Sequence, residues 1–269
     1  MVLRPLVTLR FGFTPCPNDA FAFHALVHGL VPAPFEVEAV LLDIEELNQR
    51  AADAELELSK LSFGAAAAAR DRYRLLRSGA ALGRGVGPLV VAREAASLEE
   101  AATARIAVPG RETTAFLLFR LAAPALGDVV ELRYDRILPA VVAGEVDAGL
   151  IIHESRFTYR EHGLVAVADL GEWWDGETGL PVPLAGIFAR SDLEPELIDE
   201  AEDAIRASVE YAFANPEASR DYVRALSHEL SDEVCAAHIA LYVNEHSVDI
   251  GDEGLAAIDR LLGRAAAAA

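Results

Sequence analysis

The first part of the chain alternates short apolar runs with polar segments of helical character. Strands are expected at residues 6–13, 35–42 and 56–61, and helices beginning at residues 18, 43 and 62. Apolar and polar side chains alternate along residues 35–42, as they do in a half-buried strand. Asp43 and the following Glu46 have the spacing of a capping box, which marks the start of a helix. Strands that alternate with helices in this way predict an α/β fold containing a parallel sheet.

A second α/β pattern follows, flanked by two apolar segments, 87–93 and 183–190, that both end in Ala-Arg. Within it, strands are expected at residues 105–109, 131–134 and 146–153, and helices at 113–121 and 136–143. Four helices are expected after residue 190, at 195–215, 216–226, 232–243 and 253–262. This arrangement resembles the two-lobed type II periplasmic binding proteins, with mixed sheets and two crossover strands. We expect a discontinuous larger domain (1–92 plus 184–269), an inserted smaller domain (93–183), and a ligand cleft between them.

Charge and composition exclude several classes of function. The 269 residues include 43 Asp and Glu but 23 Lys and Arg, so the formal net charge is −20. This balance opposes binding to nucleic acid, which needs cations to neutralise phosphates, and to acidic membranes. A small anionic ligand would need a local pocket of positive potential. The two cysteines, Cys16 and Cys235, form no metal-ligand or disulfide motif, so no metal site is expected.

No apolar run is long enough for a membrane helix, which needs roughly 18 consecutive residues. Residues 1–13 contain no apolar core followed by a small-residue cleavage site, so no secretion signal is expected. We therefore expect a cytoplasmic protein.

A histidine follows the last apolar run of the second α/β segment. Residues 148–152 predict a buried strand, and His153, Glu154, Ser155 and Arg156 come directly after it. Ligands of open α/β sheets bind beyond the carboxyl ends of strands, and histidine has the only side chain with an unperturbed pKa near neutrality. His153 is therefore a candidate catalytic residue, and the alternative is a cap or a satisfied buried side chain.

Polar side chains also follow two other expected strands. Asn18 and Asp19 either cap the helix that follows or bond a substrate hydroxyl. Lys60, Leu61 and Ser62 end the third strand, where the ammonium and the helix start are suited to an anion. The alternative for this second group is a solvated lysine followed by a structural cap.

Two further segments have open interpretations. Thr113 and Thr114 follow the turn at Gly110, so that backbone N–H groups at the helix start would suit a carboxylate. The segment 171–184 holds both tryptophans among glycines and prolines and is expected to be a loop. It is either a lid or rigid wall stacked on an aromatic ligand or a connector whose tryptophans pack against the domain.

Taken in order, these segments resemble the 1,4-dihydroxy-6-naphthoate synthase family of the futalosine route to menaquinone. The matching segments are Thr14-Pro15-Cys16-Pro17-Asn18-Asp19, Asp43-Ile44-Glu45-Glu46-Leu47-Asn48, Lys60-Leu61-Ser62, Pro109-Gly110 with Thr113-Thr114, Ile151-Ile152-His153-Glu154, and Trp173-Trp174 with Thr178-Gly179-Leu180-Pro181. Tyr242-Val243-Asn244 with Ser247 extends the match toward the end of the chain.

The resemblance implies a cofactor-free carbon–carbon lyase. Its substrate would be cyclic dehypoxanthine futalosine, and its products 1,4-dihydroxy-6-naphthoate and dihydroxyacetone. His153 aligns with the family's proton acceptor, while Lys60, Leu61, Ser62, Thr113 and Thr114 align with its substrate-contacting stretches. The substrate's aromatic carboxylate suits Lys60 and the start of the helix at Thr113, and its sugar hydroxyls suit Asn18, Asp19 and Ser62.

The sequence departs from the family pattern at Arg111 and Glu112, which precede the threonine pair. Three alternatives to the synthase are a sibling enzyme of the chorismate dehydratase type, a solute-binding protein that captures a small anion, and a ligand-binding regulatory lobe. The segments around His153 and Trp173 argue against the first. The missing secretion signal argues against the second, and the acidic charge and chain length argue against the third.

Overall fold

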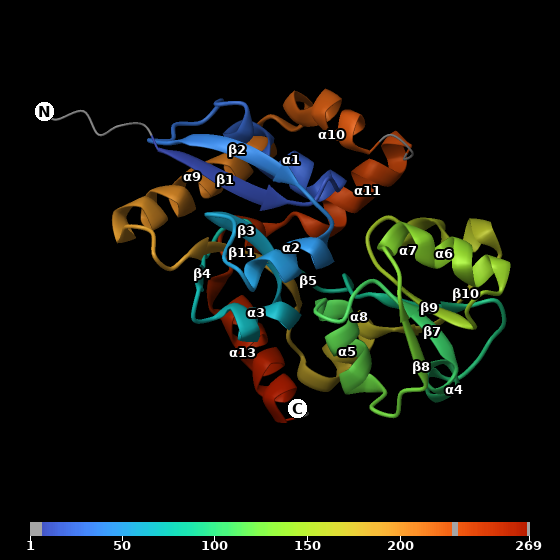
Figure 1. Ribbon diagram of the computed structural model, residues 1–269. Coiled ribbons are helices and arrows are strands. Elements are labelled where there is room, and N and C mark those ends of the chain that lie inside the picture. The colour runs from blue at the N-terminus through green and yellow to red at the C-terminus, as the bar shows by residue number, and fades with distance from the viewer. Residues whose placement is uncertain (1–6, 228–230, 268–269) are drawn as a thin grey trace, which may run out of the picture. The chain divides into compact units, whose positions relative to one another are not determined.

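The computed structural model describes residues 7–227 and 231–267, and within them the chain forms two compact α/β units (Figure 1). Unit 1 consists of Met1–Leu61, Ala68–Ala81 and Ala185–Gly251, and unit 2 of Ser62–Ala67, Leu82–Leu184 and Asp252–Ala269. Each unit is built around one mixed sheet. The predicted strand at 6–13 is present from Thr8, and its first residue lies outside the described residues.

The sheet of unit 1 has the strand order β2-β1-β3-β11-β4, and β5 pairs with β11. The strands are β1 (Thr8–Phe13), β2 (Glu36–Leu41), β3 (Leu58–Ser62), β4 (Tyr73–Leu75), β5 (Ala81–Gly83) and β11 (Val182–Arg190). As predicted from the alternating pattern, β1 runs parallel to both β2 and β3. β11 is antiparallel to β4, which makes the sheet mixed. Because β1, β2 and β3 are parallel, their carboxyl ends lie at one edge of the sheet.

Helices cover this sheet and complete the core of unit 1. They are α1 (Pro17–Val27), α2 (Ile44–Ala51), α9 (Pro195–Ala214), η2 (Pro216–Ser219), α10 (Arg220–Leu226), α11 (Asp232–Tyr242) and α12 (Glu245–Val248). The rings of Phe11, Phe13 and Phe23 pack with centroids 5.0–5.4 Å apart. The hydroxyl of Ser208 in α9 accepts from the Leu26 amide and donates to the Ala22 carbonyl, which fixes α9 against α1. α1 is therefore buried among sheet and helices.

The sheet of unit 2 has the order β10-β6-β9-β7-β8. Its strands are β6 (Leu89–Ala92), β7 (Arg105–Val108), β8 (Asp128–Glu131), β9 (Ala148–Ile151) and β10 (Val165–Asp169). Its helices are α3 (Phe63–Ala69), α4 (Leu98–Thr103), α5 (Thr114–Ala122), α6 (Tyr134–Ala143), α7 (Ser155–Thr158), η1 (Tyr159–His162), α8 (Leu170–Thr178) and α13 (Gly251–Ala267). β7 runs parallel to β8 and β9, whereas β6 is antiparallel to β9 and β10.

Two glycines allow the start of α8 to approach the segment just before β6 at backbone distance. A Cβ atom at Gly87 would lie 2.0 Å from the amide nitrogen of Gly171, and one at Gly171 would lie 2.6 Å from the nitrogen of Gly87. No side chain fits in such a space, so glycine is required at both positions.

The units divide the chain differently from the predicted domains. β6 belongs to unit 2 because it pairs with β9 and β10. α13 also belongs to unit 2, where Glu253 contacts Arg84 at 2.7 Å and Arg264 contacts Glu177 at 3.3 Å. These contacts join segments more than 80 residues apart, which a local sequence pattern does not show.

Two local predictions of secondary structure were wrong. The strand expected at residues 131–134 lies three residues earlier, at β8, and α6 already begins at Tyr134. The tryptophan-rich segment, expected to be a loop, contains the helix α8, capped by Asp169 and ended by Gly179 in the left-handed conformation.

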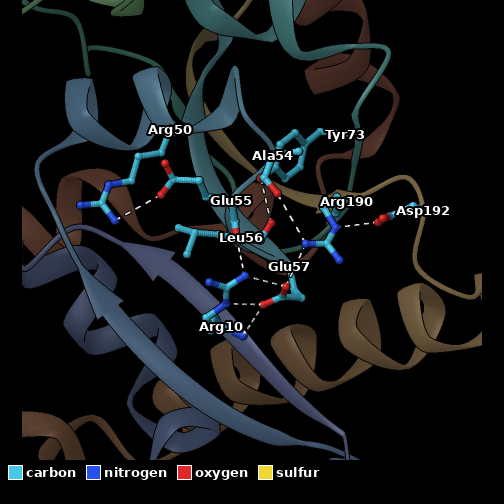
Figure 2. Close-up of polar contacts among 9 residues, drawn as sticks. All are labelled: Arg10, Arg50, Ala54, Glu55, Leu56, Glu57, Tyr73, Arg190 and Asp192. Atoms are coloured by element: carbon cyan, nitrogen blue, oxygen red, sulfur yellow. Dashed lines mark hydrogen bonds and ion pairs between the residues drawn. The ribbon is translucent and has the colours of Figure 1, made fainter.

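A partly buried carboxylate joins three strands at the amino end of β3 (Figure 2). Glu57 binds Arg10 of β1 and Arg190 of β11, each at 2.9 Å, and its side chain is 13% exposed. Burial raises the pKa of Glu57, but hydrogen bonds from Arg10 and the two positive charges outweigh burial and lower the pKa from 4.5 to about 2. Glu57 is therefore ionised at neutral pH and stabilises the folded state.

We expect Glu57→Gln to lower the free energy of unfolding by about 2 kcal/mol at pH 7. A carboxyl with a lowered folded-state pKa stabilises fully above its unfolded pKa of 4.5, so this difference shrinks as the pH falls from there toward about 2. The Arg10 side chain is 44% exposed, so solvent screens its charge. The expected loss in the free energy of unfolding is therefore smaller than the free energy that corresponds to the whole pKa shift of Glu57.

Urea denaturation at pH 7 and pH 3 measures the effect. The matched control is Asp192→Asn, because Asp192 contacts the same Arg190 at 2.6 Å but is 70% exposed. We expect this control to change stability by under about 0.5 kcal/mol. A Glu57→Gln effect of equal size at both pH values would contradict the assignment.

Candidate functional site

His153 lies in the turn between β9, which ends at Ile151, and α7, which begins at Ser155. Its φ of 56° places a histidine in the left-handed region, which costs a non-glycine residue about 1–2 kcal/mol. Its ring meets the ring of Tyr134, the first residue of α6, edge to face with centroids 4.8 Å apart. Strained backbone of this kind persists where the surrounding structure holds it, often at functional sites.

Arg156, three residues later, fixes the segment that carries His153. Its guanidinium donates to the carbonyl of Gly87 and contacts Asp169 at 2.6 Å, and its side chain is 17% exposed. Asp169 also accepts from the amides of Gly171 and Glu172, at 2.8 and 3.2 Å, and so caps α8. Arg156 thus joins the turn after β9 to the start of α8.

Thr113 and Thr114 begin α5, as predicted, and both side chains are buried. The Thr113 hydroxyl accepts from the Phe116 amide at 3.1 Å and donates to the Gly110 carbonyl at 2.8 Å. The Thr114 hydroxyl donates to the Leu184 carbonyl at 2.6 Å and accepts from the Gly64 amide at 3.1 Å. Both hydroxyls therefore hold the helix start in place, where its dipole favours an anion.

Arg111, where the chain departs from the family pattern, is held by β8. It contacts Glu131 at 2.7 Å and donates to the Val129 carbonyl at 3.1 Å. Its guanidinium also lies 5.7 Å from the centre of the Phe116 ring. The charge of Arg111 is thus compensated within unit 2.

In unit 1, Asp19 is surrounded by donors. One oxygen, Oδ2, accepts from the amide and the hydroxyl of Thr14, at 3.0 and 2.6 Å. The other, Oδ1, accepts from the Asn18 amide group at 2.8 Å and from the ammonium of Lys60. A carboxylate has about four acceptor positions, so these four donors use its whole capacity.

This network excludes two structural interpretations of the group in unit 1, whereas the substrate contacts expected of these residues stay predictions. α1 begins at Pro17 after Cys16 and has no side-chain cap, so the capping interpretation of Asn18 and Asp19 is wrong. Lys60 is 4% exposed, so the interpretation as a solvated lysine is wrong as well. Its charge is compensated by Asp19, as a buried ammonium requires.

Leu61 and Ser62 end β3, and both are buried. α3 follows immediately and packs against the segment before α5: a Cβ atom at Gly64 would lie 2.6 Å from the carbonyl oxygen of Glu112. Ser62 and Thr113, which the sequence places 51 residues apart, thus belong to segments in backbone contact within unit 2.

His238 of α11 was not predicted from the sequence. Its Nε2 lies 3.0 Å from Oδ1 of Asn18, and its side chain is fully buried. The two residues are 220 positions apart, so no local signal points to the contact.

The tryptophan pair is part of the packing of unit 2. Trp174 is fully buried and donates through Nε1 to the Pro181 carbonyl at 3.0 Å. The Arg264 guanidinium lies 5.4 Å from the centre of the Trp173 ring. The packed-connector interpretation therefore describes Trp174.

Across residues 7–227 and 231–267, no three His, Cys, Asp or Glu side chains are grouped as metal ligands. Among the same residues, no helix is long and apolar enough to cross a membrane. Cys16 and Cys235 are both buried and reduced.

A family model described as menaquinone biosynthesis matches residues 9–267. The chain belongs to this family. It is 57% identical over 259 residues to a 1,4-dihydroxy-6-naphthoate synthase of Thermus thermophilus, covering 96% of this chain and 94% of the relative. The predicted family and the prediction of an enzyme are confirmed.

Solved structures confirm the predicted fold class. A protein from Archaeoglobus fulgidus superposes with a TM-score of 0.92 at 41% identity, covering 97% of both chains. The ligand-binding component of an ABC-type import system from Staphylococcus aureus superposes with a TM-score of 0.69 at 14% identity, covering 96% of this chain and 91% of that one. The fold is that of the type II periplasmic binding proteins, with two mixed sheets.

Proposed function

We propose that this enzyme converts cyclic dehypoxanthine futalosine into 1,4-dihydroxy-6-naphthoate and dihydroxyacetone, with His153 as the general base. The observation that carries the proposal is the position of His153. It lies beyond the carboxyl end of a buried strand, in a left-handed turn beside Tyr134, in a chain 57% identical to a named 1,4-dihydroxy-6-naphthoate synthase. Ligands of α/β sheets bind at such strand ends.

In this proposal the neutral imidazole of His153 removes a proton from the substrate. The sugar-derived ring then opens and a carbon–carbon bond breaks. The three-carbon fragment takes a proton back from His153 and leaves as dihydroxyacetone, which regenerates the neutral imidazole. The naphthalene ring gains aromaticity, which makes the step downhill. A positioned base contributes on the order of 10²- to 10⁴-fold to the rate.

Binding of the substrate is assigned to the residues predicted for it from the sequence. The Lys60 ammonium has three donors, of which the Asp19 contact uses one, and we assign its charge to the substrate carboxylate. Leu61 and Ser62, with the α5 start at Thr113 and Thr114, complete the proposed substrate contacts. Asn18 contributes its amide to a sugar hydroxyl. Asp19, whose acceptor positions are occupied, acts through Lys60 and Asn18.

The test incubates the purified chain with cyclic dehypoxanthine futalosine, without added cofactor or metal, and follows the fluorescent naphthoate by chromatography. We expect product to accumulate. Binding of the substrate without turnover would replace the proposal with a solute-binding protein. Conversion of chorismate in a parallel reaction, without naphthoate from the first, would replace it with the sibling dehydratase.

A further inference from the structure

A buried histidine of unit 1 has no part in the mechanism proposed above. His238 is fully buried in α11, and its ring packs against that of Tyr242 with centroids 4.7 Å apart. Its Nε2 lies 3.0 Å from Oδ1 of Asn18, in the first turn of α1. Buried polar groups cost free energy unless they are hydrogen-bonded, so a histidine at this position needs a reason.

The neighbours of Asn18 determine the direction of this hydrogen bond. Nδ2 of Asn18 donates to Oδ1 of Asp19 at 2.8 Å, because a carboxylate oxygen only accepts. The amide oxygen therefore faces His238, and an amide oxygen also only accepts, so Nε2 of His238 is the donor. A directed chain of donors runs from His238 through Asn18 to Asp19.

This chain ends on the ammonium of Lys60. Asp19 accepts from Thr14, Asn18 and Lys60, and it is 2% exposed. The orientation of its carboxylate, and with it the position of the Lys60 charge, depends on Asn18 presenting its N–H group. Without the donor from His238, the buried Asn18 oxygen would lose its hydrogen-bond partner, and an unpaired buried acceptor favours rotation of the amide.

We infer that His238 is a positioning residue for Lys60, acting through Asn18 and Asp19. The inference rests on the proposed role of Lys60 toward the substrate carboxylate. Loss of this positioning weakens ground-state and transition-state binding alike, because the carboxylate lies away from the reacting carbons. His238→Leu should therefore raise KM about tenfold and change kcat by less than about threefold.

The first experiment compares three substitutions at position 238: two amides, glutamine and asparagine, and one apolar residue, leucine. Glutamine places an N–H group near the position of the histidine Nε2, whereas asparagine is shorter and does not reach Asn18. We expect His238→Gln to keep KM within about twofold of the parent, and His238→Asn to resemble His238→Leu. If the leucine variant does not fold, the glutamine and asparagine variants, which have the same polarity, still decide the question. Equal KM values for these two would overturn the inference.

The second experiment combines His238→Leu with Lys60→Met. If His238 acts through Lys60, the leucine substitution raises KM in the parent enzyme but not in the Lys60→Met background. Ile205→Val, a core change elsewhere in unit 1, is the control for general destabilisation and should leave KM unchanged. Equal effects of His238→Leu in both backgrounds would overturn the inference. A Lys60→Met variant with an unchanged KM would instead overturn the proposed role of Lys60.

Discussion

Replacing His153 by alanine is expected to lower kcat by about 10²- to 10⁴-fold while substrate affinity and the fold are kept. In the proposed mechanism this substitution removes the group that accepts the proton, while the proposed contacts to the substrate carboxylate are made by other residues. Single-turnover kinetics with cyclic dehypoxanthine futalosine, together with a binding titration, measure the two effects separately.

The control variant is His162→Ala, because His162 is an exposed histidine nine residues away in the same unit. It should keep full turnover. A His153→Ala enzyme that loses affinity but keeps kcat would show that His153 binds the substrate rather than acting as the base.

The backbone at His153 allows a second, independent measurement. At a φ of 56°, alanine keeps the steric strain of a Cβ atom and glycine removes it. Both substitutions remove the same imidazole and its contacts. We therefore expect His153→Gly to be more stable than His153→Ala by about 1 kcal/mol in urea denaturation, with a similar loss of kcat in both enzymes. Equal stabilities would mean that the turn is not strained and that its conformation has no bearing on the base.

The elements that the sequence predicts well are those with a local pattern. Residues 35–42 alternate as a strand does, and Asp43 caps α2 by accepting from the Glu45 amide at 2.9 Å. β8 was misplaced because its four residues are exposed or half-buried and lack an apolar pattern. The sequence predicts a loop in place of α8 because glycines and tryptophans are typical of irregular segments. In the structure, Asp169 caps the start of this helix and Gly179 ends it.

In the candidate site, too, the sequence predicts features with a local signal and misses those without one. Position after a strand and order along the chain predict His153, Lys60 and Thr113 as candidate site residues. The partners that fix these residues are distant in sequence, and only the folded chain reveals them. Asp19 lies 41 residues from Lys60, and His238 lies 220 residues from Asn18. The burial of Lys60 is a property of this network rather than of the residues beside it.

Removing Asp19 should cost more stability than any other single change in this network. Lys60 is 4% exposed, so Asp19→Ala leaves an ammonium buried without its carboxylate, and we expect a loss of about 3–5 kcal/mol in the free energy of unfolding. The measurement is urea denaturation followed by far-UV circular dichroism, because both tryptophans lie in unit 2 and their fluorescence reports that unit.

A control and a second variant separate burial from charge. Glu253→Ala breaks the Arg84–Glu253 pair, whose side chains are about half exposed, and should cost less than about 1 kcal/mol. Asp19→Ala combined with Lys60→Met removes both buried charges, and should be more stable than Asp19→Ala alone. Losses that simply add would show that the two groups are not coupled in the folded protein.

The double variant also distinguishes a stabilising pair from a functional one. Replacing a buried ion pair with apolar side chains is often neutral or stabilising. Folding stability alone therefore does not explain why Lys60 and Asp19 are present in unit 1. If Lys60 presents its charge to the substrate carboxylate, the variant Asp19→Ala/Lys60→Met recovers stability but keeps a raised KM. A variant that regains both stability and the parent KM would assign the pair to folding alone. The charge of Lys60 would then have no part in binding the substrate.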